Sequence, residues 1–380
     1  MNILNVNSYI DLKTGGGTAE RTFKMSRFLA LQGTKCTVLT INTGIDESTV
    51  AALRPANIFL TGLLWRRYFI PLVRWKTIMN LVNDADIVHL MGHWSMLNAL
   101  VYIAARRSNK PYVVCPAGAL PLFGRSAYLK NIYNFVIGRR IIKNASAWIA
   151  VTSAELVQFE SYGISASQVT VIPNGISAED FSQVDVEYYK RSIGLAGKPI
   201  ILFMGRLNPI KGPDLLLHAY ALVHKHIPEF HLVFAGPDEG MKSTLIEMAQ
   251  QSNVSDYVHF LGYVGGGDKS AAYHMADLLV VPSRQEAMSI VALEAAVCGT
   301  PVMLTDQCGF NEVKSIRPDF EVPADISGIA NGLMSLLEEP EKLKHDSVLL
   351  QEFVIKRYAW DSIVHVYIEL YKNILAIQKK

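Results

Sequence analysis

Residues 276–306, which read ADLLVVPSRQEAMSIVALEAAVCGTPVMLTD, decide the fold of this chain. Leu278–Val281 is an apolar, β-branched run, a turn begins at Pro282, and an alanine-rich helical pattern starts near Ser289. A second short apolar run, Val302–Leu304, follows that helix. Strand, helix and strand in this order predict a parallel sheet that is covered by helices.

The same alternation continues in both directions along the chain. We predict strands at Asn2–Val6, Lys35–Ile41, Ile87–Leu90, Tyr112–Cys115, Ala147–Val151, Val169–Ile172, Pro199–Met204, His231–Ala235 and Val258–Leu261. We predict helices at Ala19–Leu31, Asp214–His226, Lys242–Gln251, Ser289–Cys298, Glu338–Arg357 and Trp360–Leu375. The pattern restarts after about residue 185, so the 380 residues indicate two doubly wound α/β domains in succession.

Composition excludes several classes of protein. Half of the residues are hydrophobic and 18% are charged, which is typical of a globular chain, and the net charge of +2 suggests no nucleic-acid partner. The four cysteines form no CxxC motif, so we expect neither a disulfide framework nor a zinc site. We also expect no signal peptide and no spanning helix, and therefore a cytoplasmic protein whose membrane contact, if any, is peripheral.

The charge is unevenly distributed. Residues 1–185 carry 18 Lys and Arg against 11 Asp and Glu, a net +7, whereas residues 186–380 carry 18 against 23, a net −5. The excess of positive charge is concentrated in residues 48–143, which contain 13 Lys and Arg and two Asp, a net charge of +11. Aromatic and basic residues mix at 64–76 and 123–143. This region could bind an anionic membrane surface or a phosphorylated acceptor, or it could be an ordinary solvated helix surface.

In doubly wound sheets, ligands bind beyond the carboxyl ends of the strands, so the turns there are the candidate sites. The first turn contains Gly15, Gly16 and Gly17, whose backbone could approach an anion closely. The dinucleotide fingerprint is broken because Glu20 stands where its last glycine belongs, which argues against a nicotinamide oxidoreductase.

A second turn carries Arg206 and Lys211, five residues apart. An Arg fork and a Lys point charge could together clamp a diphosphate, although two solvated surface cations would give the same pattern. The order of residues excludes a Walker loop.

The third turn carries Glu286 and precedes a helix for which Ser289 is a plausible N-cap. The amides of Ile290 and Val291 would then be available to a phosphate. Glu294 lies eight residues after Glu286, about 80° away around a helix. The two carboxylates could bind sugar and ribose hydroxyls, or they could be a surface residue and a buried ion-pair partner.

Two histidines lie near one predicted strand of the first half. His93 follows the strand and could act as a hydrogen-bonding or acid–base group, whereas His89 lies within the strand and is expected in the core. The motif Asp84-Ala85-Asp86 precedes its predicted strand, so it lies at the amino end and not at the carboxyl end where ligands bind. We therefore do not interpret it as a metal site.

At this point the residues resemble one family, the retaining glycosyltransferases of family 4, also called group 1, which have the GT-B fold. The matching segments are GGGTAE (15–20), DIVHLMGHW (86–94), IPNGI (172–176), GRLNPIKGPDLLL (205–217), FAGP (234–237), FLGYV (260–264) and the opening stretch 276–306 with its E-x₇-E spacing. They follow the family's order over most of the chain.

The resemblance implies two Rossmann-like domains facing across a cleft: residues 1–182 with a returning C-terminal helix at about 361–380, which bind the acceptor, and residues 183–360, which bind the donor. It implies a UDP- or GDP-sugar as donor, no cofactor and no required metal. It assigns the diphosphate to Arg206, Lys211, the Gly15–Gly17 loop and the amides after Ser289. It assigns the donor sugar to Glu286, the ribose to Glu294, and the base to the backbone at Tyr263 and Val264.

The expected activity is transfer of a sugar to a lipid-linked glycan acceptor in polysaccharide or lipopolysaccharide biosynthesis, at the inner face of the plasma membrane. The alternatives are a sugar-nucleotide enzyme of the epimerase type and a catalytically silent family member. One departure stands out: many members have a His after the fifth strand, where this chain has Ala117. This departure puts the role of His93 and the identity of the donor in question.

Overall fold

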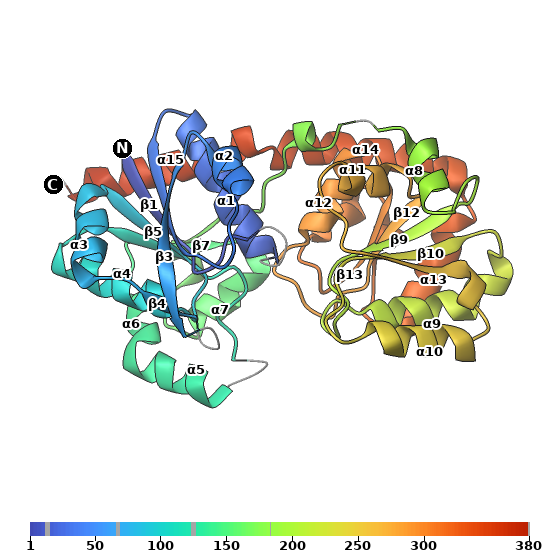
Figure 1. Cartoon of the computed structure of the whole chain (residues 1–380), viewed down its shortest axis with the longest axis horizontal. Helices are drawn as coiled ribbons and strands as arrows, with labels where there is room; N and C mark the ends of the chain where they lie inside the picture. Colours follow the sequence, from blue (N-terminus) through green and yellow to red (C-terminus); the bar gives the residue numbers. More distant parts are fainter. Residues whose placement is uncertain (12–15, 66–68, 123–126, 183, 379–380) are drawn as a thin grey trace. The chain divides into compact units, whose positions relative to one another are not determined.

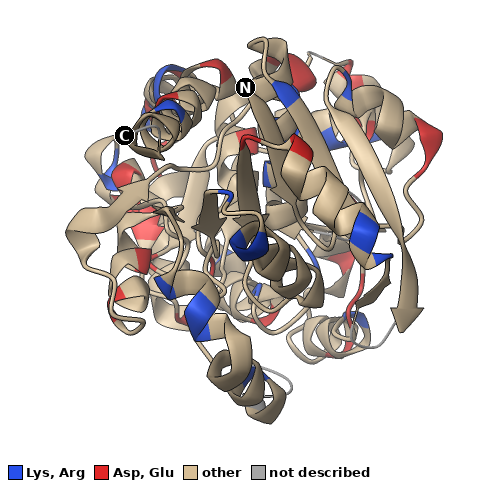
Figure 2. Cartoon of the chain, turned by 90° about the vertical axis from the view of Figure 1, so that its left-hand side faces the viewer, with Lys and Arg blue, Asp and Glu red and all other residues tan. Residues whose placement is uncertain are grey.

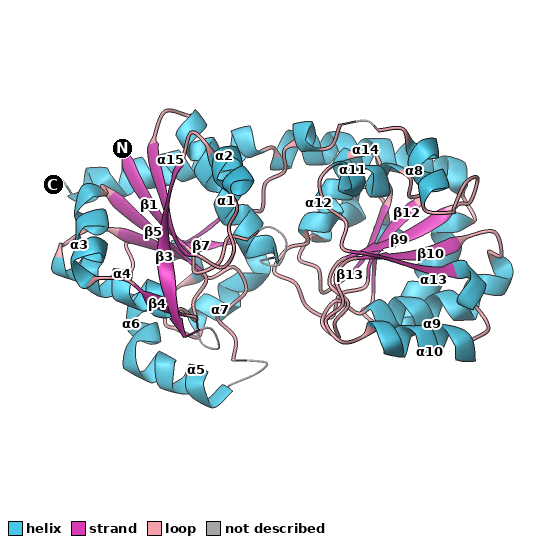
Figure 3. Ribbon diagram, viewed as in Figure 1, coloured by secondary structure: helices cyan, strands magenta, loops and turns pink. Residues whose placement is uncertain are grey.

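The computed structural model describes residues 1–11, 16–65, 69–122, 127–182 and 184–378. The chain forms two compact units, one made of Met1–Gly175 with Trp360–Lys380 and the other of Ile176–Ala359 (Figure 1). Each is an α/β layer structure with helices on both faces of one sheet, which confirms the predicted fold class (Figure 3). Among the described residues, no helix combines the length and hydropathy needed to cross a bilayer.

Unit 1 contains an eight-stranded sheet in the order β4-β3-β2-β1-β5-β6-β7-β8, parallel except for β4. Its strands are β1 (Asn2–Val6), β2 (Lys35–Ile41), β3 (Asn57–Trp65), β4 (Ile70–Leu72), β5 (Ile87–Met91), β6 (Tyr112–Cys115), β7 (Ala147–Ala150) and β8 (Val169–Val171). Its helices are α1 (Gly16–Leu31), α2 (Glu47–Leu53), α3 (Trp75–Asp84), α4 (Met96–Arg107), α5 (Ala127–Tyr133), the π-helix η2 (Asn134–Gly138), α6 (Arg139–Lys143), α7 (Leu156–Glu160) and α15 (Trp360–Gln378).

Unit 2 contains a six-stranded, parallel sheet in the order β11-β10-β9-β12-β13-β14. Its strands are β9 (Ile200–Met204), β10 (His231–Ala235), β11 (Val258–Gly262), β12 (Leu278–Val281), β13 (Val302–Thr305) and β14 (Glu321–Val322). Its helices are α8 (Val186–Ser192), α9 (Pro213–Val223), α10 (Lys242–Gln251), α11 (Gly267–His274), α12 (Ile290–Val297), α13 (Ile326–Leu337) and α14 (Pro340–Tyr358).

The central strands are apolar because both of their faces are covered. Every residue of β9, β10 and β12 is buried, as expected for parallel strands between two helical layers. In Figure 1, α9, α10 and α13 cover one face of the unit 2 sheet, and α11, α12 and α14 cover the other. The carboxyl ends of the strands therefore form the one edge at which loops from both layers meet.

The strands that sequence reasoning predicted are present to within one residue at each end. It missed β3, β4 and β14. Most residues of β3 are exposed or partly buried, so its apolar run lacks the alternation that identifies a strand, and β14 has only two residues. The helix predicted at 214–226 ends at Val223 and continues as a 3₁₀ turn through His226.

The C-terminal helix α15 packs against α1 in unit 1 through buried polar contacts. The Arg21 guanidinium donates to Asn174 Oδ1 at 2.8 Å, to the Ile172 carbonyl at 2.7 Å and to the Tyr367 hydroxyl. Arg21 is 1% exposed, so these acceptors take the place of water at its two terminal nitrogens. One side chain thus joins α1, the segment after β8 and α15.

His89 lies beneath the same helix and is buried, as the sequence predicted. Its Nδ1 lies 2.6 Å from the Tyr371 hydroxyl. Burial, followed by the nearby Arg21 charge, lowers the pKa of His89 to about 3. The imidazole is therefore neutral in the folded protein at physiological pH.

We predict that Arg21→Met lowers the free energy of unfolding by about 3 kcal/mol or more, because it leaves several buried acceptors without a donor. Arg27→Met is the matched control on the same helix, and it should cost about 1 kcal/mol or less. Denaturant unfolding measures both changes. Equal losses for the two variants would contradict the central role of Arg21.

His89 should also make stability depend on pH. Its pKa is lowered in the folded state, so its stabilising contribution is complete above the unfolded value of about 6.5 and is lost as pH falls toward the folded value. We predict that the free energy of unfolding falls less between pH 6.5 and 5 for His89→Asn than for the exposed control His226→Asn. The slopes of the unfolding free energy against pH should differ by the uptake of about one proton, which His89 would have bound on unfolding. Identical pH slopes would contradict this prediction.

Candidate functional site

Three loops meet at the carboxyl edge of the unit 2 sheet. The Gly205 amide donates to the Ala235 carbonyl at 2.9 Å, and the Arg284 amide donates to the Ile210 carbonyl at 2.8 Å. Gly212 has a φ of 66°, and a Cβ there would lie 2.1 Å from the Pro282 carbonyl oxygen. Only glycine fits this close approach, which places the β9–α9 loop against the loop after β12.

Lys211 and Glu286, predicted from separate turns, come together at this edge. Lys211 Nζ lies 2.7 Å from Glu286 Oε1, and the Ser283 hydroxyl donates to the same oxygen at 2.6 Å. The Glu286 side chain is 9% exposed and that of Lys211 is 25% exposed. The pair is thus a partly buried cation and carboxylate, oriented by a neighbouring hydroxyl.

Arg206, the other predicted cation, pairs with Glu239. Its Nη1 donates to Glu239 Oε1 at 2.9 Å, and the Asn208 amide donates to Glu239 Oε2 at 2.7 Å. Asn208 Oδ1 also accepts from the Lys211 amide at 3.0 Å, so one side chain organises the whole loop. Burial opposes ionisation of Glu239, but the bonds from Asn208 and Arg206 outweigh it and lower the pKa of Glu239.

The N-terminus of α12 faces the same edge. Ser289 is its N-cap, as predicted, and accepts a long bond from the Ala292 amide at 3.4 Å. The amides of Ile290 and Val291 belong to the first turn, where the helix supplies no carbonyl partner. They are therefore donors at the positive end of a helix dipole.

Glu294 is completely buried and takes part in an ion pair. Lys269 Nζ lies 2.5 Å from its Oε1, and the Tyr273 hydroxyl donates to its Oε2 at 2.5 Å. Of the two roles that the sequence left open, the structure shows the ion-pair role. A ribose hydroxyl would have to share or replace one of these two contacts.

Tyr263 and Val264 follow β11, on the loop that leads into α11. The Tyr263 side chain is about half exposed, and its ring lies over Gly265, where an added Cβ would be 2.7 Å from the hydroxyl. The backbone of this loop is next to the strand β10, whose following residue Gly236 donates to Gly262 at 2.6 Å.

In unit 1, the predicted glycine turn is only partly described. Gly15 lies outside the described residues, whereas Gly16 and Gly17 form the exposed first turn of α1. Gly16 has a φ of 65°, a conformation that other residues rarely adopt.

His93 is buried, with 2% of its surface exposed. Its Nε2 lies 2.9 Å from Asn134 Oδ1, and the rings of Trp94, Tyr133 and Tyr162 surround it. Burial lowers the pKa of His93 to about 4, although the bond to Asn134 opposes the shift. This enclosed, neutral imidazole is poorly suited to proton exchange at physiological pH, and we assign it no such step.

Sequence reasoning missed two acidic residues. Glu239 follows β10 at the carboxyl edge, and its position after a strand was the available signal. Glu155 is buried in unit 1, where its carboxylate accepts from the Gly118 amide at 3.0 Å and from the Val151 amide at 3.2 Å. It thereby holds the turn at Ala117, which has a φ of 50° and stands where a His was expected. Nothing in the local sequence marks Glu155.

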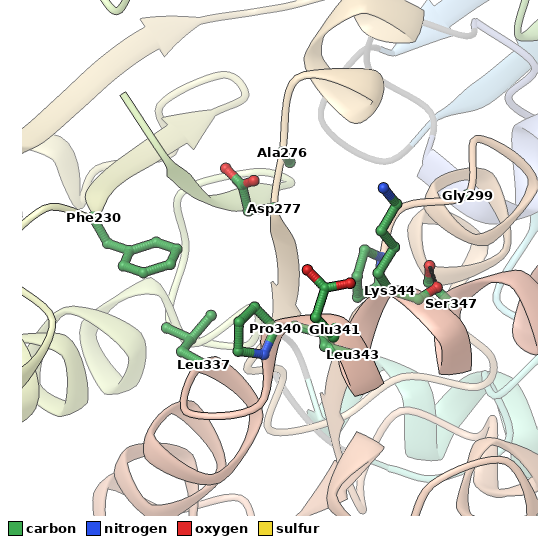
Figure 4. A pocket seen from close by; sticks show the side chains of 11 residues that line it. Phe230, Ala276, Asp277, Gly299, Leu337, Pro340, Glu341, Leu343, Lys344 and Ser347 are labelled. Carbon is green, nitrogen blue, oxygen red and sulfur yellow. Dashed lines mark hydrogen bonds between the residues drawn. The ribbon is translucent and has the colours of Figure 1, made fainter. Parts of the chain in front are cut away.

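Two cavities lie away from these loops. One of about 300 Å³ is at the amino edge of the unit 2 sheet, where Asp277, Glu341 and Lys344 line it together with apolar residues (Figure 4). Asp277 accepts from the Ile200 amide at 2.7 Å, which indicates a structural role. The other, in unit 1, measures about 1070 Å³. Within the described ranges, no three His, Cys, Asp or Glu side chains gather as potential metal ligands.

Two family profiles match the chain. The profile described as Glycosyl transferases group 1 matches residues 185–347, and that described as Glycosyltransferase Family 4 matches residues 15–180. The D-inositol 3-phosphate glycosyltransferase of Actinosynnema mirum is 37% identical over 246 residues, which are 58% of this chain and 58% of that protein. The chain spans about half the length of the first curated relatives that it matches, at 58%, 40% and 49%.

A further relative matches over nearly the whole chain. The phosphatidyl-myo-inositol mannosyltransferase of Mycobacterium leprae is 26% identical over 94% of this chain and 93% of its own length. Among solved structures, Anabaena HepE in complex with UDP and glucose has a TM-score of 0.79 at 18% identity, covering 98% of this chain and 100% of its own.

Sucrose-phosphate synthase from Thermosynechococcus elongatus has a TM-score of 0.79 at 19% identity, with 99% of each chain covered. At these identities the likeness establishes the fold. The two profiles follow one another in the same order as the two sheets, and each matches the unit that carries the corresponding motifs. The chain belongs to the group 1 glycosyltransferases of family 4, with the GT-B fold.

Proposed function

We propose that this protein is a retaining, metal-independent glycosyltransferase that moves a sugar from a UDP- or GDP-sugar to a glycan acceptor. The observation that carries the proposal is the pairing of Lys211 with Glu286, 2.7 Å apart at the carboxyl edge of the unit 2 sheet. A cation for phosphate and a carboxylate for sugar hydroxyls are needed side by side at the bond that breaks. UDP and UDP-glucose occupy structures of Anabaena HepE, a relative in fold, which supports a nucleotide-sugar donor.

The donor diphosphate is assigned to Arg206, Lys211 and the first-turn amides of α12. Arg206 offers a planar fork and Lys211 a point charge, and each now pairs with a carboxylate at 2.9 Å or less. A bound diphosphate would share these cations with Glu239 and Glu286. Because the cations and the helix dipole neutralise the phosphates, a divalent metal is not needed for this role.

The transfer breaks the bond between the anomeric carbon and the diphosphate oxygen and forms a bond from that carbon to an acceptor hydroxyl oxygen. The hydroxyl proton leaves with the released nucleoside diphosphate. Fixed donors that stabilise the growing charge on this leaving group lower the barrier, because they need no reorganisation during the reaction. Glu286 orients the donor sugar through its hydroxyls.

The nucleoside is assigned to the adjoining part of unit 2. Glu294 is proposed to bind the ribose, with Lys269 and Tyr273 holding the carboxylate in place. The backbone at Tyr263 and Val264 is proposed to meet the base. The retaining outcome rests on the family and not on any distance in the site.

The acceptor is proposed to be a lipid-linked glycan of cell-surface polysaccharide or lipopolysaccharide biosynthesis, reached from the cytoplasmic side of the membrane. Two observations support it: the net +11 of residues 48–143 and the large cavity in unit 1. Figure 2 faces this unit and marks its Lys and Arg residues in blue. The name of the relative from Mycobacterium leprae describes transfer to a phosphatidyl-inositol, which is an anionic lipid.

We predict that Lys211→Met and Glu286→Gln each reduce sugar transfer by at least about 100-fold, because each removes a group fixed at the reacting bond. The exposed ion pair of Lys372 and Glu369, at 3.0 Å on α15, supplies the matched controls Lys372→Met and Glu369→Gln. Steady-state rates with the preferred donor give the comparison. Full activity in either site variant would refute the assignment, whereas the controls should retain it.

Metal independence predicts that chelation has little effect. We expect transfer rates within about twofold of the untreated value after dialysis against EDTA, since fixed cations carry the phosphate charge. Loss of activity that Mg²⁺ or Mn²⁺ restores would show that a metal is required. Unfolding monitored in the same buffers separates a catalytic effect from a structural one.

A further inference from the structure

The large apolar cavity in unit 1, which supports a lipid-linked acceptor, has so far been assigned no part of that acceptor. It measures about 1070 Å³, at the upper end of the range of about 300–1,000 Å³ for small-molecule sites. Its walls come from α4, from α5 with the π-helix η2, and from β4, and they include Leu100, Ile103 and Ile137. The cavity is partly open to solvent, so its apolar walls contact water that an apolar guest would displace.

One end of the cavity is polar. Ser8 and Ser95 line it there, with their hydroxyls 2.5 Å apart, and Tyr133 donates to the Ser95 carbonyl at 3.0 Å. Ser8 follows β1, and Ser95 caps the N-terminus of α4 just after β5, so this end lies at the carboxyl edge of the sheet. Ile103, eight residues along the same helix, lies about 12 Å from that edge.

The cavity opens through an unusual helix. Within the π-helix η2, Asn134 turns inward to bond with His93 and Tyr162, while Phe135 is 88% exposed and Val136 is 56% exposed. Val136 also lines the cavity. The π-turn therefore presents apolar side chains to solvent at the mouth, an arrangement that matches insertion into an apolar environment.

Cationic residues lie in and next to the cavity. Lys130 is the one charged residue among the described residues that line the cavity, and its ammonium lies 5.4 Å from the centre of the Trp94 ring. The adjoining helix α6 carries Arg139, Arg140 and Lys143. A guest with an anionic head and a hydrocarbon tail complements both the charge and the apolar walls.

We propose that this cavity binds the hydrocarbon chain of the acceptor amphiphile, with its phosphate near Lys130 and Ser95 and its tail along α4 and η2. The identification of this guest as the acceptor rests on the proposed function, whereas the binding of an alkyl phosphate can be measured without catalysis. The head lies at the carboxyl edge, where the family fold carries its chemistry, and the tail leaves through the exposed face of η2.

The test uses soluble n-alkyl monophosphates of eight to twelve carbons, below their critical micelle concentrations, in competition with a fluorescent apolar probe on the full chain. We expect affinity to rise about fourfold per added methylene, the factor set by hydrocarbon burial. Inorganic phosphate should not displace the probe. Affinity that does not depend on chain length would overturn the proposal.

Two pairs of variants locate the binding. Val136→Glu at the mouth should weaken dodecyl phosphate binding at least tenfold, whereas Val157→Glu, at a similarly exposed valine of α7 outside the cavity, should not. Lys130→Gln should reduce the preference for dodecyl phosphate over dodecanol, and Lys372→Gln, at an exposed lysine of α15 outside the cavity, should leave that preference unchanged. Equal effects within either pair would contradict the site, and because all four side chains are at least partly exposed, the variants should fold.

A vesicle-binding experiment distinguishes binding of a single amphiphile in the cavity from general binding to a membrane surface. If the protein floats with anionic phosphatidylglycerol vesicles but binds no monomeric alkyl phosphate, the face is a general membrane surface and the proposed cavity site is wrong. Hydrolysis of the donor without acceptor reports the proposed function separately. Donor hydrolysis without alkyl binding would overturn only this inference, and alkyl binding without use of any nucleotide sugar would overturn only the proposed function.

Discussion

The ion pair between Lys211 and Glu286 is the contact on which the carboxyl edge of unit 2 depends. It joins the loop after β9 to the loop after β12, which are 75 residues apart in sequence. Asn208 accepts from the Lys211 backbone amide and Ser283 donates to the Glu286 carboxylate, so the loop and the carboxylate are both held before a ligand arrives. The carboxylates at this edge hold the cations in place, and under the proposed function a diphosphate would share those cations.

Unit 1 is organised around a different buried cation. Arg21 connects α1, the segment that follows β8 and the C-terminal helix, and His89 packs beneath that helix as a neutral group. Ser8 and Ser95 lie at the carboxyl edge of the same sheet and line the apolar cavity. The two units thus differ in chemistry: one concentrates fixed charge at its edge, and the other has an apolar cavity beside its edge.

The fold was predictable because parallel strands between helices are almost wholly apolar, and β9, β10 and β12 show this directly. Arg206, Lys211, Glu286 and Ser289 were predictable because each follows a strand at the carboxyl edge. Glu239 carried the same signal, since it follows β10, but the sequence reasoning did not use it. Lys269 and Glu155 could not be predicted, because tertiary packing places them and no local pattern records it. His93 illustrates the same limit: its position suggested a reactive group, but Asn134 and three aromatic rings from distant segments enclose it.

The central claim is that unit 2 is built to hold a nucleoside diphosphate sugar with its own cations. The most direct measurement is a thermal-shift panel of UDP- and GDP-sugars in the presence of EDTA, because a ligand that binds the native state raises its melting temperature. The account predicts that at least one such donor raises Tm in a concentration-dependent manner, while the free sugar and inorganic phosphate do not. A panel in which no nucleotide sugar shifts Tm more than inorganic phosphate does would contradict it.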